Sequence, residues 1–295
     1  MTVSDILDGA FRLMKANARS VLPIVAVFVV PLQVVAAFAQ RNLFDGAGLL
    51  DALSDPSLTE GTTAQTDVDA LVGLAAGLLN ILVLPFLAGA ISQVVAASYL
   101  GRELGPGDAL RATWRRAWAL FGGWVVVHLL QVATLLLAGI LVAGLAVAGA
   151  GTAAVVVAVL GVLTGVPAAL AVMALSVVVA PAIVVEHLGP IRGTKRSWSL
   201  VRRRFWAVLG TALLAGLIAT TLGQILGFVP SAAGLLIGLR GGWVLLAAGA
   251  VLTALITQPI VAIVATLQYF DLRIRFEGFD LEVIAAELAA SGSRR

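Results

Sequence analysis

The stretch that decides the fold runs from Leu120 to Val185 and reads LFGGWVVVHLLQVATLLLAGILVAGLAVAGAGTAAVVVAVLGVLTGVPAALAVMALSVVVAPAIVV. It is 66 residues long and contains no Asp, Glu, Lys or Arg. A helix needs about 20 apolar residues to cross the hydrocarbon core of a bilayer. The stretch is therefore long enough for two long membrane spans or three short ones.

The whole chain shares this apolar character. Its 295 residues are 60% hydrophobic and only 12% charged, and the mean hydropathy is +1.05. Soluble domains average about 25% charged residues, so this chain cannot coat a soluble fold of its size with charge. The absence of cysteine excludes disulfides, thiolate catalysis and cysteine-ligated metals. The composition excludes a water-soluble enzyme and predicts an integral membrane protein.

The distribution of charge determines the number of spans. The other long apolar stretches are 21–40, 70–100 and 205–270, and the last contains a single charge, Arg240. Basic residues gather on the cytoplasmic side of membrane proteins. With two spans in each long stretch, 17 of the 19 bases fall on one side, and only Arg41 and Arg240 fall on the other. We therefore predict an all-α protein of the cell membrane with six spans and both termini in the cytoplasm.

The first span has a second interpretation. Ala37-Phe38-Ala39 follows an apolar core and fits the cleavage site of a signal peptide. Pro23 and Pro31 lie inside that core, and a long helical segment precedes it, so a retained span is favoured. The acidic segment 41–69 that follows has one base and six acids. We expect it to be an extracytoplasmic loop, and its sequence leaves open whether the loop is ordered.

A short amphipathic pattern recurs three times, and each copy precedes two spans. Apolar or small residues lie at offsets 0, 4, 7 and 11, which is one face of a helix. The copies are Leu7, Phe11, Met14, Ala18; Leu110, Trp114, Ala117, Phe121; and Thr194, Trp198, Val201, Phe205. The small residues Ala10, Thr113 and Ser197 stand just before the aromatic in each copy. Two spans return the chain to the side of the membrane on which it started. The repeats are therefore expected to be parallel to one another and related by rotation about an axis near the membrane normal.

These patterns define one membrane domain over residues 1–290. Its repeat units cover about 4–100, 106–186 and 190–278. Asp280 is a suitable N-cap for a terminal surface helix over 280–290, and residues 291–295 form a tail.

Basic residues surround the amphipathic segments. Helices with aromatic residues on one face and arginines on another lie in the membrane interface, where each arginine gains about 1 kcal/mol from anionic headgroups. The candidate headgroup contacts are Arg115, Arg116, Arg202, Arg203 and Arg204. The simpler alternative, which we favour, is that these bases only fix the topology of the spans.

Polar residues within the spans are few. Proton relays and ion-coupled transporters place charged residues at membrane depth, and the six predicted spans have none. Asn80, His128 and Gln131 are the candidate intramembrane polar contacts, and His128 and Gln131 share a helix face. An interhelical hydrogen bond is the favoured role for His128, because a metal or proton site would need further ligands.

A charged segment follows the last span. On a helix, Asp271 would pair with Arg275, and Arg273 with Glu277, each four residues apart. Gly278 then suits a left-handed C-terminal cap. Together with Tyr269, these residues form a candidate docking or structural motif.

This segment, Tyr269-Phe270-Asp271-Leu272-Arg273-Ile274-Arg275-Phe276-Glu277-Gly278-Phe279-Asp280-Leu281, resembles the end of the glycerophosphoryl diester phosphodiesterase membrane-domain family. Phe270 replaces a second tyrosine of that pattern, and Phe276 stands where a base is common. The segments 6–13 and 196–206 are also similar to the family. The resemblance implies a six-span membrane domain that in some members precedes a soluble metal-dependent phosphodiesterase. We expect no such activity here, because two histidines without an extramembrane acid–histidine cluster cannot assemble that site.

These observations favour a non-catalytic scaffold or accessory subunit of a cell-envelope membrane complex. The alternative is a transporter or channel for small molecules or lipids, based on the repeats and the proline-containing spans. A membrane-embedded hydrolase is disfavoured because no nucleophile–base or metal cluster is visible. The expected partners are membrane lipids and another membrane protein, without nucleic acid, metal or cofactor.

Overall fold

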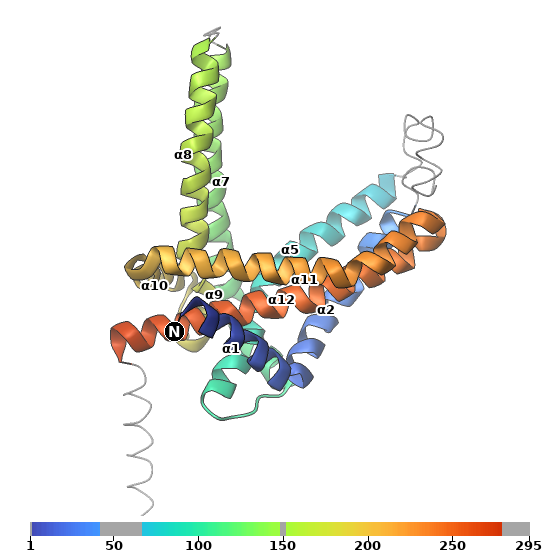
Figure 1. The fold of residues 1–295 in the computed structure, drawn as a ribbon, viewed down its shortest axis with the longest axis vertical. Helices are drawn as coiled ribbons and strands as arrows, with labels where there is room; N and C mark the ends of the chain where they lie inside the picture. The colour runs from blue at the N-terminus through green and yellow to red at the C-terminus, as the bar shows by residue number, and fades with distance from the viewer. Residues whose placement is uncertain (1, 42–66, 148–151, 279–295) are drawn as a thin grey trace, which may run out of the picture. The chain divides into compact units, whose positions relative to one another are not determined.

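The computed structural model describes residues 2–41, 67–147 and 152–278, and all regular structure within these ranges is helical (Figure 1). The elements are α1 (Val3–Ala16), α2 (Ala18–Ala39), α5 (Asp67–Tyr99), α6 (Pro106–Trp114), α7 (Ala117–Val147), α8 (Thr152–Ser176), α9 (Val179–Val185), α10 (Pro190–Val201), η2 (Arg202–Arg204), α11 (Phe205–Ile237) and α12 (Leu239–Glu277).

Six helical segments are long and apolar enough to cross a membrane, which confirms the predicted all-α class and the number of candidate spans. They lie within 18–39, 67–99, 117–136, 159–185, 190–237 and 240–277. The predicted terminal helix 280–290 and most of the acidic loop 41–69 lie outside the described residues.

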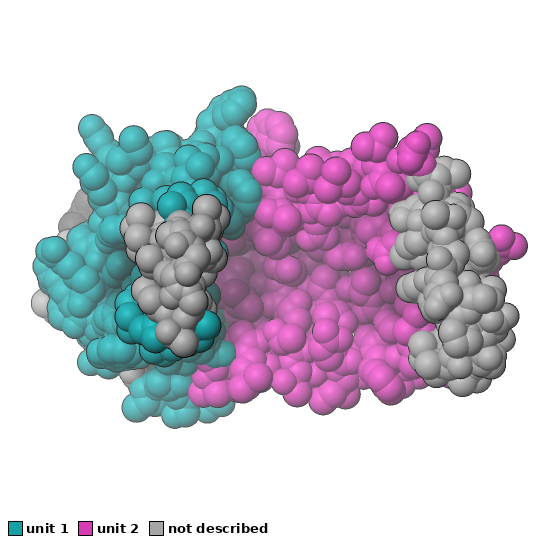
Figure 2. Space-filling model, turned by 90° about the horizontal axis from the view of Figure 1, so that it is seen from above, with its two compact units in different colours: residues 1–9, 115–213, 264–295 teal, residues 10–114, 214–263 magenta. Residues whose placement is uncertain are grey.

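The chain divides into two compact units that interleave along the sequence (Figure 2). Unit 1 comprises residues 1–9, 115–213 and 264–295, and unit 2 comprises residues 10–114 and 214–263. The helices α1, α11 and α12 each contribute residues to both units.

Unit 1 has its core where α7 meets α9. Leu120 and Val127 of α7 pack with Val179 and Ile183 of α9, and all four side chains are buried. Gly123 permits this approach, since an added Cβ would lie 2.8 Å from Cδ1 of Ile183. Beyond this core, α7 and α8 run side by side as a hairpin (Figure 1).

Unit 2 contains the antiparallel pair α2 and α5. Near one end of the pair, Asn17 Nδ2 donates a hydrogen bond to Ser98 Oγ at 3.2 Å. At the other end, Arg41 Nη1 lies 3.0 Å from Asp69 Oδ1. Arg41 is one of the two bases predicted on the outer side, and the Asp69 carboxylate is its ion-pair partner.

Glycines bring α11 and α12 together in unit 2. A Cβ added at Gly234 would lie 2.6 Å from the Gly242 carbonyl oxygen. Gly223 and Gly227 lie against Thr253, whose hydroxyl donates to the Gly223 carbonyl at 2.9 Å. Small residues allow membrane helices to approach closely enough for such contacts.

The segments with the recurring pattern form α1, α6 and α10. In each, the small residue before the aromatic is buried: Ala10 is 0%, Thr113 2% and Ser197 0% exposed. The aromatic that follows is more accessible, and Trp114 is 72% exposed. The packed face of these helices is therefore centred on the small residues.

Candidate functional site

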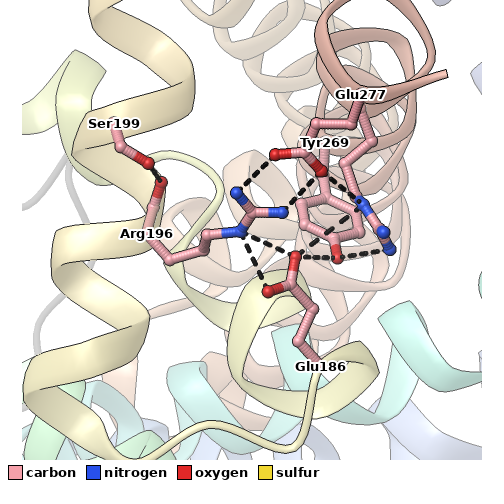
Figure 3. A network of polar contacts seen from close by, with 6 residues as sticks. Glu186, Arg196, Ser199, Tyr269 and Glu277 are labelled. Atoms are coloured by element: carbon pink, nitrogen blue, oxygen red, sulfur yellow. Dashed lines mark hydrogen bonds and ion pairs between the residues drawn. The ribbon is translucent and has the colours of Figure 1, made fainter. Parts of the chain in front are cut away.

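The charged end of α12 takes part in a network of polar contacts within unit 1 (Figure 3). We call it the polar cluster and define it as Glu186, Arg196, Tyr269, Arg273 and Glu277. Glu186 follows α9 directly, Arg196 lies on α10, and the other three residues lie on the last turns of α12. The contacts of α12 with Arg196 and with Glu186 join residues that are 81 and 83 positions apart in the sequence.

Arg196 bridges two carboxylates at the centre of the cluster. Its Nε donates to both oxygens of Glu186 at 2.9 Å. Its Nη1 and Nη2 donate to the two oxygens of Glu277 at 2.5 and 2.6 Å. The planar guanidinium fork suits such paired contacts, which a lysine ammonium cannot reproduce.

Tyr269 and Arg273 complete the network from α12. The Tyr269 side chain is buried, and its hydroxyl donates to Oε1 of Glu186 at 2.7 Å. Arg273 Nε donates to Oε2 of Glu277 at 3.1 Å, and its Nη1 lies 3.4 Å from the Tyr269 hydroxyl oxygen. The pair of Arg273 with Glu277 confirms the predicted spacing of four residues.

A second set of ion pairs lies beside the polar cluster. Asp271 accepts hydrogen bonds from Nε of Arg275 at 3.1 Å, as predicted. It also accepts one at 3.1 Å from Nη1 of Arg204, which the sequence did not indicate. Gly278 has a φ of +64°, confirming the predicted left-handed residue directly after α12.

A tight turn after α9 positions Glu186. The next residue, His187, has a φ of +56°, and its carbonyl accepts a hydrogen bond from Arg116 Nη1 at 3.1 Å. Gly189 then precedes Pro190 at the start of α10, a position where proline suits a helix. On α10, Ser197 donates to the Leu175 carbonyl at 2.5 Å, which attaches this helix to α8.

The chemistry of the polar cluster is that of mutually satisfied charges. Its side chains are 14–26% exposed where they form ion pairs, so each charge is partly withdrawn from water and held by opposite charges. Among the described residues, no group of three or more His, Asp or Glu could hold a metal ion. The arrangement holds α10, α12 and the end of α9 together.

The candidate headgroup contacts have different surroundings. Arg115, Arg202 and Arg203 are exposed, and the Arg203 guanidinium lies 5.1 Å from the centre of the Phe276 ring. Arg116 and Arg204 are half-buried and hold the contacts given above. The first three are the more accessible to lipid.

The candidate intramembrane residues belong to two different units. Asn80 lies on α5 in unit 2, whereas His128 and Gln131 lie on α7 in unit 1. Nδ1 of His128 is 2.9 Å from the Trp124 carbonyl oxygen, one turn earlier in the same helix. Its ring centre is 4.0 Å from that of Trp124. The interhelical hydrogen bond of His128 stays a prediction.

Sequence reasoning missed Glu186 and Arg196 as partners of the terminal motif. One signal was present: Glu186 is the only acidic residue between Asp108 and Asp271. A single acid next to a segment rich in bases indicates an ion pair. The sequence does not show which of those bases forms it.

Comparison with known proteins gives one family match. A family model described as a domain of unknown function, DUF7847, matches residues 1–272. No curated protein and no solved structure matches the chain.

Proposed function

The chain belongs to the DUF7847 family, and from this premise we propose that it is a non-catalytic multipass membrane protein, acting as a scaffold or accessory subunit of a cell-envelope membrane complex. The observation that carries the proposal is the pairing within the polar cluster. Arg196 donates to both Glu186 and Glu277, and Arg273 and Tyr269 hold the same two carboxylates. A general base or nucleophile needs a group that can reach a substrate, whereas these groups hold one another.

The apolar helix surfaces support a role in assembly. Large side chains on both helices of the α7–α8 hairpin are more than half exposed, among them Leu135, Leu136, Val155 and Val156. In a bilayer such faces are covered by lipid chains or by helices of another membrane protein. We propose that lipids and one membrane protein partner share them.

Copurification tests the scaffold proposal. The full chain, tagged and extracted from its native membrane in a mild detergent, is expected to bring one other membrane protein in a fixed molar ratio. Gly139 on α7 has open space around its Cβ position. Gly139→Trp would block a partner helix there and is expected to reduce the amount of copurified partner. Trp118→Ala at the start of the same helix is the control and is expected to leave that amount unchanged. Recovery of the chain alone in repeated preparations would contradict the proposal.

We propose that the protein lies in the cell membrane with both termini in the cytoplasm, as three parallel repeats. The equivalent burial of Ala10, Thr113 and Ser197 supports the repeats. The gathering of 17 of the 19 bases on the proposed cytoplasmic side supports the orientation, and Asp69 neutralises Arg41, one of the two bases on the proposed outer side. A reporter enzyme fused at Thr62 is expected to lie outside the cytoplasm. Activity of a reporter that works only in the cytoplasm would show that the proposed orientation of every helix is wrong.

We also propose that the family is related to the glycerophosphoryl diester phosphodiesterase membrane domain. Tyr269 and Asp271 support this relation, because both belong to the resembling segment, lie within the matched residues and hold contacts between separate parts of the chain. An alignment of DUF7847 members should keep these residues if the relation holds. Free variation at both positions would contradict it.

One observation favours transport as a second candidate function. The fourth candidate span is discontinuous, because α8 ends at Ser176 and α9 begins at Val179. Transporters of several folds build substrate sites from discontinuous helices. Vesicles containing the purified chain should then move a small solute or a labelled lipid faster than empty vesicles, and equal rates would exclude this function.

A further inference from the structure

A cavity of about 290 Å³ lies within unit 1, next to the polar cluster. Its walls are the N-terminal residues of the chain with the start of α1, Arg204 with the first turns of α11, and the end of α12. Drug-sized ligands occupy pockets of about 300–1,000 Å³. The cavity is therefore large enough for a polar headgroup but not for a whole lipid.

Arg204 and Asp271 bring charge to the cavity wall, and they are joined by a hydrogen bond of 3.1 Å. Asp271 is shared with Arg275, whose Nε lies 3.1 Å from both carboxylate oxygens. Two guanidinium groups thus face one carboxylate, and the Arg204 side chain keeps 33% of its surface exposed. Arginine has five N–H donors, so Arg204 retains donors for a phosphate.

A buried side chain in the cavity wall has an unsatisfied oxygen. Gln268 is 2% exposed, and its Nε2 donates to the Val208 carbonyl at 3.2 Å. Its Oε1 is buried and has no hydrogen-bond partner within the described parts of the chain. Buried polar groups are nearly always hydrogen-bonded, so this oxygen indicates a missing donor.

The residues around the cavity are typical of the headgroup layer. Arg202, Arg203 and Arg204 precede the apolar helix α11, and Trp206 at its start is 80% exposed. Tryptophan and arginine at the end of a span mark the interface between lipid and water. Leu213, two turns further along α11, is 46% exposed and offers an apolar surface for an acyl chain.

We propose that this cavity binds the headgroup of a glycerophospholipid whose headgroup carries a hydrogen-bond donor. The phosphate lies at Arg204. Oε1 of Gln268 is buried in the cavity wall, so the proposal includes a turn of the Gln268 side chain that brings this oxygen to the donor, an ethanolamine ammonium or a glycerol hydroxyl. Asp271 lies beside both groups and favours a donor over a second anion. The inference goes beyond the proposed function, because such a site would serve a scaffold and a transporter equally.

Binding of defined lipids to the full chain tests the proposal. The protein is delipidated in detergent and titrated with phosphatidylethanolamine, phosphatidylglycerol and phosphatidylcholine of identical acyl chains, and bound lipid is counted by native mass spectrometry. Phosphatidylcholine has the phosphate but no headgroup donor, so we expect it to bind roughly tenfold more weakly than the better of the other two, a step equal to one charge-assisted hydrogen bond. The two donor-bearing lipids distinguish an ammonium from a hydroxyl. Equal binding of all three would overturn the proposal.

Two variants and a matched control locate the site. Gln268→Met leaves Arg204 in place and is expected to abolish the preference over phosphatidylcholine. Arg204→Gln is expected to weaken all three lipids about tenfold. Lys195→Gln removes an exposed base of α10 that does not line the cavity, and it is expected to change binding less than about twofold, since it removes no contact in the cavity. Unchanged selectivity in Gln268→Met, or an equal loss in Lys195→Gln, would contradict the proposal even if Arg204→Gln failed to fold.

Discussion

Arg196 holds two carboxylates, Glu186 and Glu277, that come from distant parts of the chain. A guanidinium group can do this because its donors point along two edges of one plane. The polar cluster therefore acts as a joint: it fixes α10 to the residue that ends α9 and to the final turn of α12. Its stability depends on all the charges being present together, since removing one leaves a partly buried opposite charge.

We expect Arg196→Ala to lower the free energy of unfolding by about 2 kcal/mol. Hydrogen bonds to charged groups contribute about 1.5–3 kcal/mol, and partial exposure keeps the loss below the roughly 3–5 kcal/mol of a fully buried pair. Thermal unfolding in detergent measures the change. Lys195→Ala removes an exposed base one position earlier and serves as the control. Equal unfolding temperatures for the two variants would contradict the claim that Arg196 fixes α10 to the end of α9 and to α12.

Tyr269→Phe removes only the hydroxyl that donates to Glu186. We expect a loss of about 1 kcal/mol, the usual net value of one hydrogen bond. A double-mutant cycle with Glu186→Ala isolates the contact, because alanine has no oxygen to accept the hydroxyl proton and residues that interact give non-additive effects. Strictly additive effects of the two substitutions would show that the hydroxyl and the carboxylate do not interact.

The short-range half of the site was predictable from the sequence, and the long-range half was not. Spacing of four residues on a helix predicted the pairs of Asp271 with Arg275 and of Arg273 with Glu277, because the helix alone brings such residues together. The contacts of Glu186, Arg196 and Arg204 with α12 depend on how separate elements pack. Periodicity within one segment contains no information about that packing.

At the scale of elements, apolar length predicted the candidate spans well and their ends poorly. The stretch 70–100 became α5, which begins earlier at Asp67, because backbone hydrogen bonds continue a helix beyond the apolar residues. The break between α8 and α9 lies just before Pro181, in one of the spans that were expected to kink at a proline. A proline inside a helix lacks a backbone donor and crowds the carbonyl of the residue four positions earlier. The recurring amphipathic pattern correctly predicted the positions of α1, α6 and α10. Within them, however, the small residues Ala10, Thr113 and Ser197 are buried, and the aromatic residues that follow are more accessible. Small residues pack there because backbone can approach them closely, and the aromatics remain accessible to the membrane interface.

The contact of α11 with α12 yields a prediction at this scale. We expect Gly234→Ala to lower the free energy of unfolding by about 1–3 kcal/mol, because the new Cβ would overlap the Gly242 backbone and force the helices apart. Gly216→Ala on the same helix meets open space, and we expect it to be neutral or to stabilise by about 0.5–1 kcal/mol through helix propensity. Unfolding in detergent compares the two. Destabilisation of equal size at both positions would contradict a close crossing.

At the scale of the whole molecule, the proposals depend on the layout of charge across the membrane. Only 12% of the residues are charged, and 17 of the 19 bases fall on one side when the chain crosses six times. An odd number of crossings between residues 205 and 270 would place the Arg202–Arg204 turn and the end of α12 on opposite faces. The scaffold role and the lipid headgroup site both require these two segments at one membrane surface.

Single-cysteine labelling tests this layout most directly, because the chain contains no cysteine and each introduced thiol is read without background. Thr62→Cys, Ala150→Cys and Arg240→Cys are expected to react with a membrane-impermeant maleimide added to intact cells. Glu103→Cys and Lys195→Cys are expected to react only after the membrane is opened. Labelling of Lys195→Cys in intact cells, or protection of Thr62→Cys and Arg240→Cys until lysis, would contradict six spans with both termini in the cytoplasm.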